Sequence, residues 1–418
     1  MRIIYGEPNL IRTIIAMKKT LKSMLFACTT VVAMNACTGQ KTSQELTASG
    51  LNPADFDTTY VDSIQGEKPV RLFTLKNDKG MEVCITNFGG RIVSIVVPDK
   101  EGKPTDVVLG FPTVAEYFPE NNQSDFGSSV GRYANRIKDG LLPINGDTVR
   151  LARNNYGHCL HGGLHGWMYQ VYDATQEDDR TLLLSLTAPD GENNFPGEVK
   201  VTVRMQLAED SNALTITYSG QTDKPTVLNM TNHSYFNLNG DPAKPITNCI
   251  AQINADNFTP TDNTYMTTGE ILPVAGTPFD FTQPKAIGKD FTGANPAREL
   301  VAIENGEDHT GYDHNWVLNT YKDGKGDWTQ VCATVYSPVT GIQLNVYTNE
   351  PGIQFYTGNF QNGTVIGKGG VAYPKNAAFC LETQKYPNAP QNPHWPSSHL
   401  NPGEQYQSVC IYEFTIHE

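Results

Sequence analysis

The sequence predicts an all-β protein, and most of its 418 residues are expected to form a single large β-sandwich. Two observations support this fold class. Apolar and polar residues alternate with a period of two in several long runs, which is the pattern of a strand with one buried and one solvated face. The chain also contains 37 glycines and 26 prolines, and turn-forming residues lie between those runs.

The clearest strands can be justified in chain order. The run from Val199 to Leu207 alternates Val, Met and Leu with Lys, Thr, Arg and Gln. The same alternation predicts strands at 214–218, 342–346 and 406–416. Turn sequences occur at 77–80, 99–102 and 145–146, and the last of these, Asn-Gly, is typical of a two-residue hairpin. No stretch of the sequence shows the amphipathic pattern of a helix of three turns, so we expect an all-β fold.

Residues 1–36 are not expected to belong to the folded domain. Residues 1–16 have the character of an extension upstream of the true start, which we place at Met17. A lysine-rich segment at 18–22 and an apolar segment at 23–36 then have the form of a secretory signal peptide, too short to span a membrane. We therefore expect an exported protein.

Cys37 and the residues before it resemble the lipidation site of bacterial lipoproteins. Two outcomes remain open: a lipoprotein anchored to the membrane of a Gram-negative bacterium through Cys37, or ordinary signal cleavage that releases a periplasmic protein. Residues 37–60 are polar and lack periodicity, which predicts a flexible tether. Residues 61–418 are expected to form one domain, because no linker or repeat interrupts them.

The formal net charge of −13 restricts the partners. Nucleic acid requires faces rich in Lys and Arg, and so does docking on anionic lipid, so both are excluded as main partners. A neutral small molecule is the expected ligand, and a lipid anchor would be the one membrane contact.

Beyond Cys37 the chain carries six cysteines that never form a CxxC pair. Zinc-site spacing is therefore absent. An exported protein can form disulfides, but several of these cysteines lie in apolar runs where buried thiols are equally expected, and the sequence leaves both alternatives open.

Two titratable residues stand in surroundings that favour apolar side chains. His233 lies in the strand-like stretch TNHSYFNL, residues 231–238, and Glu382 follows the apolar run 377–381. The structural alternatives are a histidine hydrogen-bonded within a sheet and a carboxylate held in a salt bridge. The functional alternative is an acid–base pair, since a buried carboxylate is costly unless it is paired or functional.

Further polar residues cluster in three stretches: GRYANRI at 131–137, HCLHGGLHGW at 158–167 and YDHNW at 312–316. Arginine and amide side chains of this kind suit hydroxyl or carboxylate recognition. The three histidines of the second stretch have glycines between them and so lack the helical i,i+4 geometry of a zinc protease, and no metal site is predicted there. We expect the glycines to bend the backbone so that one histidine faces a cleft.

Six stretches, in this order, resemble the aldose 1-epimerase family: GRYANRI, LHGG, TNHSYFNL, YDHN, GIQFYTGN and AAFCLETQ. The resemblance covers roughly residues 65–418. It implies a single large antiparallel β-sandwich of the galactose mutarotase type, which agrees with the fold predicted above. It also implies an isomerase that interconverts the α and β anomers of free aldohexoses such as galactose and glucose, without a cofactor.

The resemblance implies His233 as general acid and Glu382 as general base. It implies that sugar hydroxyls are held by Asn135, Arg136, His161, Asp313 and Gln354. We further expect Tyr235 to orient the ring, and Trp395 to influence substrate preference because relatives often have a smaller aromatic there.

Two other classes of protein remain as alternatives. An exported glycoside hydrolase would usually place two carboxylates about the scissile bond, whereas the best candidate acid here is a histidine. A non-catalytic carbohydrate-binding module could lose either His233 or Glu382 without penalty. The presence of both residues favours the epimerase.

Overall fold

The computed structural model describes residues 45–62, 64–122, 124–294 and 310–418. These residues belong to one compact unit, Gln44–Glu418. The predicted signal peptide, the lipidation site at Cys37 and residues 37–44 of the predicted tether lie outside the described residues. Within the described ranges, every helix is too short or too polar to pass through a membrane.

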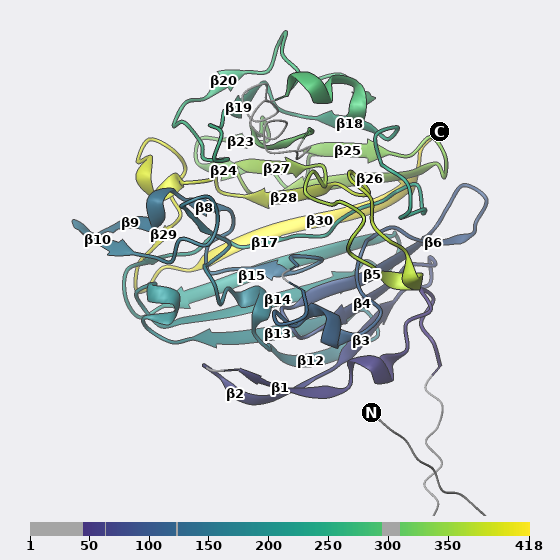
Figure 1. The fold of residues 1–418 in the computed structure, drawn as a ribbon, viewed down its shortest axis with the longest axis horizontal. Coiled ribbons are helices and arrows are strands. Elements are labelled where there is room, and N and C mark those ends of the chain that lie inside the picture. The colour runs from purple at the N-terminus through teal and green to yellow at the C-terminus, as the bar shows by residue number, and fades with distance from the viewer. Residues whose placement is uncertain (1–44, 63, 123, 295–309) are drawn as a thin grey trace, which may run out of the picture. The chain divides into compact units, whose positions relative to one another are not determined.

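A nine-stranded antiparallel sheet is the largest element of the fold (Figure 1). In spatial order its strands are β12 (Asp173–Asp178), β13 (Thr181–Ala188), β14 (Val199–Leu207), β15 (Ala213–Thr222), β30 (Tyr406–Ile416), β26 (Ile342–Thr348), β25 (Ala333–Tyr336), β18 (Ile250–Ile253) and β21 (Lys285–Ala286).

Two smaller antiparallel sheets accompany it. The five-stranded sheet contains β20 (Leu272–Pro273), β19 (Asn257–Thr259), β22 (Asp313–Val317), β27 (Gly352–Tyr356) and β28 (Cys380–Gln384). The four-stranded sheet contains β3 (Leu72–Lys76), β4 (Glu82–Thr86), β5 (Arg91–Pro98) and β6 (Pro104–Asp106).

Short two-stranded pairs and 3₁₀ helices complete the described fold. The pairs are β1 (Thr58–Asp62) with β2 (Gly66–Val70), β9 (Leu141–Ile144) with β10 (Asp147–Arg150), β8 (Arg136–Ile137) with β11 (Cys159–Leu160), β16 (Thr226–Val227) with β29 (His399–Leu400), β7 (Ser129–Val130) with β17 (Thr231–Asn232), and β23 (Tyr321–Lys322) with β24 (Lys325–Gly326). The 3₁₀ helices are η1 (Pro53–Phe56), η2 (Val114–Tyr117), η3 (Lys138–Gly140), η4 (Trp167–Tyr169), η5 (Glu192–Asn194), η6 (Ile287–Gly293), η7 (Lys368–Gly370) and η8 (Ala389–Gln391).

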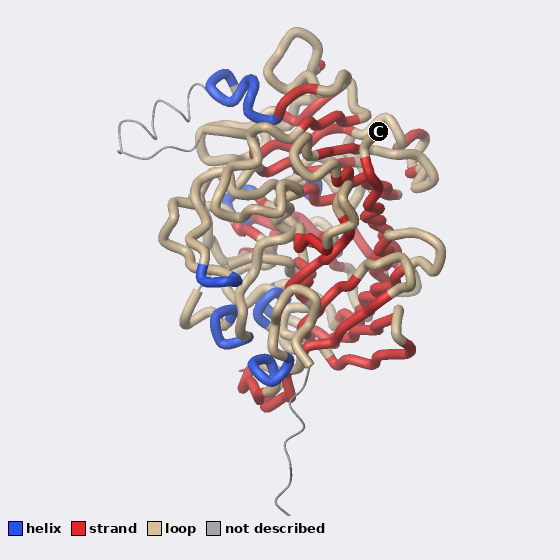
Figure 2. The backbone as a smooth tube through the Cα atoms, turned by 90° about the vertical axis from the view of Figure 1, so that its right-hand side faces the viewer, coloured by secondary structure: helices blue, strands red, loops and turns tan. Residues whose placement is uncertain are grey.

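The main hydrophobic core lies between the nine-stranded sheet and the other two sheets. One continuous cluster contains Val201 and Val203 of β14, Trp316 of β22, Phe355 of β27 and Ile85 of β4, all buried. Figure 2 shows most strands gathered toward one side of the molecule, with most loops and short helices toward the other. This is the predicted antiparallel β-sandwich, and burial of these apolar faces is the main force that stabilises it.

The alternating patterns locate the strands well. β14 and β30 have the predicted bounds, and in β14 the odd-numbered residues are buried while the others are more exposed. The Asn145-Gly146 turn joins β9 to β10, with both residues at positive φ, 51° and 84°. This is the backbone that a two-residue hairpin requires, and Asn and Gly adopt it at low cost.

Residues 45–60 correct the prediction of a flexible tether. They contain η1 and the start of β1, and Leu51 and Phe56 are buried in a second cluster with Val114 and Tyr117. Burial of Leu51 and Phe56 holds this segment against the domain. The six described cysteines are free and buried, so among the described residues the buried-thiol alternative holds.

The stretch 231–238 is a strand only at its start. β17 ends at Asn232, whose side chain accepts a hydrogen bond from Ser234 N at 3.1 Å and donates one to Gly127 O at 2.9 Å. His233 lies just beyond the strand, and its backbone still pairs with the neighbouring segment: His233 N donates to Ser128 O and Gly127 N donates to His233 O, both at 2.9 Å. These hydrogen bonds fix the imidazole just past the end of the strand, where the cavity described next begins.

Candidate active site

One face of the five-stranded sheet is polar although it is buried. Across β22, β27 and β28, Asn315 lies opposite Gln354 and Gln354 lies opposite Glu382. Because side chains alternate along a strand, Asp313 and Tyr356 point to this same face. The apolar residues between them face the core instead, so Glu382 belongs to a polar surface that this alternation creates.

A cavity of about 270 Å³ opens over this face. All of the predicted site residues except Gln354 line it: Asn135, Arg136, His161, His233, Tyr235, Asp313 and Glu382. They come from separate stretches of the chain, which the sheet and the loops above it bring together. The structure thus gathers residues that sequence patterns located one by one.

His233 and Glu382 form the closest titratable pair in the cavity. His233 Nε2 lies 3.5 Å from Glu382 Oε1, and both side chains are buried. The other polar atom of each group, His233 Nδ1 and Glu382 Oε2, is buried without a hydrogen-bond partner among the described residues. Buried polar atoms are normally satisfied, so this pair has unused hydrogen-bonding capacity that a ligand can fill.

Burial raises the pKa of Glu382 to about 7, and the neighbouring His233 lowers it in part. Desolvation disfavours the ionised carboxylate, which explains the direction of the shift. A carboxylate with a pKa near neutrality is a far better proton acceptor than one with an ordinary value. Glu382 is therefore suited to act as a general base at physiological pH.

Tyr235 and His161 surround the imidazole of His233. The Tyr235 ring stacks on it with centroids 5.0 Å apart, and the His161 ring meets it edge-on at 5.3 Å. His161 Nδ1 accepts a hydrogen bond from Asn135 N at 3.2 Å, so its hydrogen is carried on Nε2. Burial lowers the pKa of His161 to about 3, which keeps this imidazole neutral and makes it a fixed hydrogen-bond donor.

Arg136 and Asp313 supply charges to the opposite part of the cavity. Arg136 Nε donates to Asn155 Oδ1 at 3.0 Å, and its Nη1 lies 4.0 Å from Asp313 Oδ2. Gln354 does not line the cavity; its Nε2 donates to Asp313 Oδ1 at 2.7 Å. Gln354 therefore holds Asp313 in place, which differs from the expected direct contact with a ligand.

Of the three histidines in the stretch 158–167, one lines the cavity, as expected. His158 is held by Asp139 N and Thr264 Oγ1, at 3.0 Å and 2.8 Å, and His165 is exposed. Asp125, His161 and His233 do bring one potential metal-ligand atom each within 4.8 Å of the others. However, His161 Nδ1 is occupied by Asn135 N–H and its Nε2 carries hydrogen, so this donor set does not fit a metal ion.

Sequence patterns missed several residues of the cavity: Asp125, Tyr356, Phe360 and Gln361. Tyr356 could have been found from its position two residues after Gln354, on the same strand face. Asp125 and Gln361 lie in loops that carry no periodic signal. Trp395, by contrast, packs against Tyr386 and is absent from the cavity lining, so its expected influence on substrate preference has no contact to act through.

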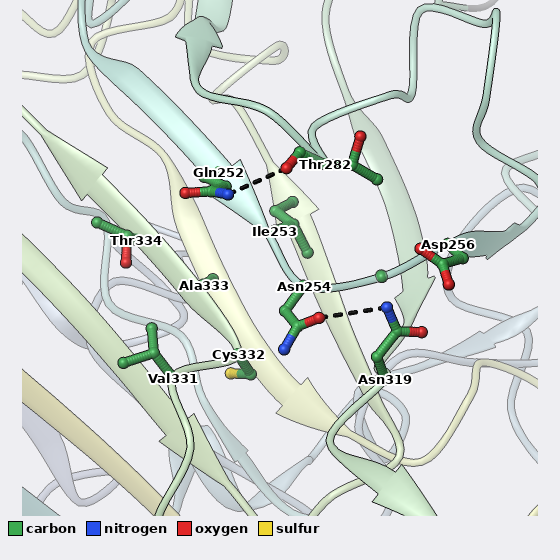
Figure 3. Close-up of a pocket in the computed structure, with 11 residues that line it drawn as sticks. Gln252, Ile253, Asn254, Asp256, Thr282, Asn319, Val331, Cys332, Ala333 and Thr334 are labelled. Carbon is green, nitrogen blue, oxygen red and sulfur yellow. Dashed lines mark hydrogen bonds between the residues drawn. The ribbon is translucent and has the colours of Figure 1, made fainter.

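A second, larger cavity of about 400 Å³ lies at β18 and β25 (Figure 3). Its amides bond to each other and to the backbone: Gln252 Nε2 donates to Thr282 O at 3.0 Å, and Asn319 Nδ2 donates to Asn254 Oδ1 at 3.2 Å. Its lining contains no acid–base pair comparable to His233 and Glu382. The smaller cavity is therefore the candidate active site.

Comparison with known proteins adds independent evidence. The family described as Aldose 1-epimerase matches residues 71–413. The galactose mutarotase of Sus scrofa is 40% identical over 360 residues, covering 86% of this chain and 98% of that protein. The aldose 1-epimerase of Escherichia coli (strain K12) is 36% identical over 349 residues, covering 83% and 96%. A solved structure of a GalM/aldose epimerase homologue from C. elegans superimposes with a TM-score of 0.73 at 30% identity, covering 83% and 99%.

Proposed function

The chain belongs to the aldose 1-epimerase family, and from this premise we propose how its cavity carries out the reaction. The protein is an isomerase that interconverts the α and β anomers of free aldohexoses. We assign the general base to Glu382 and the general acid to His233. The observation that carries this assignment is the 3.5 Å approach of His233 Nε2 to Glu382 Oε1 in a cavity lined by polar groups.

The reaction opens and recloses a hemiacetal ring. Glu382 accepts the proton of the C1 hydroxyl while His233 donates a proton to the ring oxygen O5, and the C1–O5 bond breaks to give the open aldehyde. Rotation about C1–C2 then presents the other face of the aldehyde to the O5 hydroxyl. His233 takes back its proton, Glu382 returns its proton to O1, and the opposite anomer forms with both side chains restored.

The geometry suits these two proton transfers. O1 and O5 are bonded to the same carbon, so their acid and base must be neighbours, as the imidazole and the carboxylate are. Glu382, with a pKa of about 7, accepts a proton readily near neutral pH. Each positioned proton transfer contributes roughly 10²–10⁴-fold. Because two side chains supply both transfers, the proposed mechanism uses neither a metal nor another cofactor.

The remaining cavity residues are proposed to hold the sugar. Arg136 and the N–H of His161 offer donors, Asp313 offers acceptors, and Asn135 can offer both. Tyr235 supports the imidazole by stacking on it. Gln354 acts indirectly, through its hydrogen bond to Asp313.

Polarimetry tests this function directly. Purified protein added to fresh α-D-galactose or α-D-glucose should accelerate the decay of optical rotation, and Glu382→Gln should abolish most of the acceleration. Release of reducing ends from a disaccharide without accelerated mutarotation would instead support a glycoside hydrolase. Sugar binding with neither activity would support a carbohydrate-binding module.

We also propose that the enzyme is exported and anchored through a lipid on Cys37, on the strength of the signal-like segment at 18–36. Fractionation of cells that express the full chain tests this proposal. The protein should partition with membranes, and Cys37→Ser should move it to the soluble fraction. A distribution that does not respond to Cys37→Ser would contradict the anchor and leave a soluble periplasmic enzyme as the alternative.

A further inference from the structure

Two polar side chains of the cavity have no role in the mechanism above. The carboxylate of Asp125 forms no hydrogen bond with the described residues, although the Asp125 backbone carbonyl accepts one from Ser128 Oγ at 2.9 Å. Gln361 is 9% exposed, and both its Oε1 and Nε2 are buried without a partner. Both side chains line the same cavity as His233 and Glu382.

The Gln361 amide is buried without a partner, which is costly, whereas the Asp125 carboxylate is partly exposed at the cavity wall. An unsatisfied buried polar group loses its hydration without compensation, whereas a bound hydroxyl would restore the missing hydrogen bonds. A carboxylate accepts two hydroxyl donors and an amide both donates and accepts, which suits the hydroxyls of a sugar. These two residues therefore have the chemistry of a second polar subsite for the same ligand.

The position of Asp125 indicates which end of the sugar this subsite meets. Asp125, His161 and His233 bring one polar atom each within 4.8 Å of the others, while Glu382 contacts His233 through Nε2. In the proposed reaction, His233 addresses O5 and Glu382 addresses O1. O5 is bonded to both C1 and C5. Glu382 addresses the C1 side, so the other polar groups near His233 are expected to face C5 and its hydroxymethyl group.

We propose that Asp125 and Gln361 form a subsite for the C5 hydroxymethyl group of an aldohexose, which makes the enzyme select aldohexoses over pentoses and 6-deoxyhexoses. This inference rests on the proposed orientation of the sugar between His233 and Glu382. A site built to hydrogen-bond a hydroxyl rejects analogues that lack it, because its own polar groups are then left unpaired. Since the subsite is remote from the reacting atoms, its contribution should appear in KM rather than in kcat.

A matched series of sugars tests the subsite. D-Galactose, 6-deoxy-D-galactose and L-arabinose share the configuration at C1 to C4 but carry, in turn, a hydroxymethyl group, a methyl group and no substituent at C5. The wild type should show kcat/KM for D-galactose roughly tenfold or more above the values for the other two sugars. Asp125→Ala should lower kcat/KM for D-galactose by roughly 10- to 100-fold, mostly through KM, and change the other two by less than about threefold.

Two controls separate the subsite from other effects. Gln361→Leu should shift the same preference in the same direction by a smaller factor, because a neutral amide forms weaker hydrogen bonds than a carboxylate. Asp78→Asn, at an exposed position of the 77–80 turn, removes a charge far from the subsite residues in the sequence and should leave the preference unchanged. An equal loss of kcat/KM for all three sugars in Asp125→Ala would overturn the proposal, as would equal use of the three sugars by the wild type.

A binding measurement keeps this test independent of the proposed catalytic residues. Methyl β-D-galactopyranoside and its 6-deoxy analogue cannot open their rings, so calorimetry reports their affinity without turnover. Tighter binding of the former by the wild type, lost in Asp125→Ala, supports the subsite even if polarimetry contradicts the roles of His233 and Glu382. Equal affinity of the wild type for the two glycosides would refute the subsite, whatever polarimetry shows.

Discussion

Two buried glutamates, Glu192 and Glu382, have opposite hydrogen-bonding environments. Burial raises the pKa of both carboxyls above the usual range. Glu192 accepts hydrogen bonds from Trp167 Nε1 at 3.0 Å and from Gln170 Nε2, and Arg132 Nη2 lies 3.6 Å away. Glu382 has His233 at 3.5 Å and an Oε2 without a partner among the described residues.

The difference shows that burial alone does not identify a reactive carboxylate. Glu192 is saturated by protein donors, so its charge is used to hold the structure together. Glu382, by contrast, has an oxygen atom without a hydrogen-bond partner among the described residues, and a substrate hydroxyl can bind there. The GRYANRI stretch serves both regions, because Arg132 reaches Glu192 whereas Arg136, four residues later, lines the cavity.

The largest expected effect is on turnover at Glu382. Glu382→Gln preserves the shape but removes the base, so kcat should fall by roughly 10²–10⁴-fold with a much smaller change in KM. His233→Asn should have an effect of the same order, and the double variant should lose less than the product of the two single losses, since the pair acts as a unit. Polarimetry with D-galactose provides the measurement. Turnover close to wild type in either single variant would contradict the assignment.

Glu192 should show the reverse behaviour. Glu192→Ala leaves the guanidinium of Arg132 buried without its counter-charge, which should reduce the free energy of unfolding by about 3–5 kcal/mol. Urea denaturation followed by fluorescence measures this loss. At a temperature where the variant remains folded, its kcat should stay within about threefold of wild type, because Glu192 lies outside the cavity lining. A large loss of kcat in the folded variant would contradict the assignment of a purely structural role to Glu192.

The sequence predicts this contrast only in part. It locates Glu382, His233 and the strands β14 and β30, because period-two alternation and the strand-like run before Glu382 are local patterns. It does not reveal that Arg132 and Arg136 serve different regions, since their partners lie far away in the chain. Nor does it reveal Asp125, because a single polar residue in a polar loop has no local signal, and only the fold brings it beside His233.

The pH dependence of activity provides a sharper comparison. With a pKa of about 7, Glu382 should be largely protonated at pH 6, whereas the base must be ionised to accept the C1 proton. The kcat/KM for D-galactose should therefore fall roughly tenfold per pH unit well below pH 7. Glu192→Gln, whose carboxyl takes no part in proton transfer, should leave this acid limb in place. An acid limb near pH 4.5, the ordinary range of a glutamate, would contradict the raised pKa.

The smallest expected effect concerns stability, and it has an unusual sign. The pKa of Glu382 is about 7 in the folded protein against an ordinary value of 4.5, so between these values the native state binds a proton that the unfolded chain has released. Stability contributed by this group is therefore present below pH 4.5 and is lost as the pH rises to 7. A shift of this size corresponds to at most about 3 kcal/mol.

Glu382→Gln carries no such penalty, because an amide does not ionise. The difference between its free energy of unfolding and that of the wild type should be near zero at pH 4. At pH 8 the variant should be more stable than the wild type by about 1–3 kcal/mol. Urea unfolding at both pH values measures the difference. In the matched variant Glu192→Gln the buried guanidinium of Arg132 loses its counter-charge, so stability should fall at pH 8 instead. A Glu382→Gln protein less stable than wild type at pH 8 would mean that Glu382, like Glu192, stabilises the fold through its charge, because relief of desolvation is the reason to expect a gain.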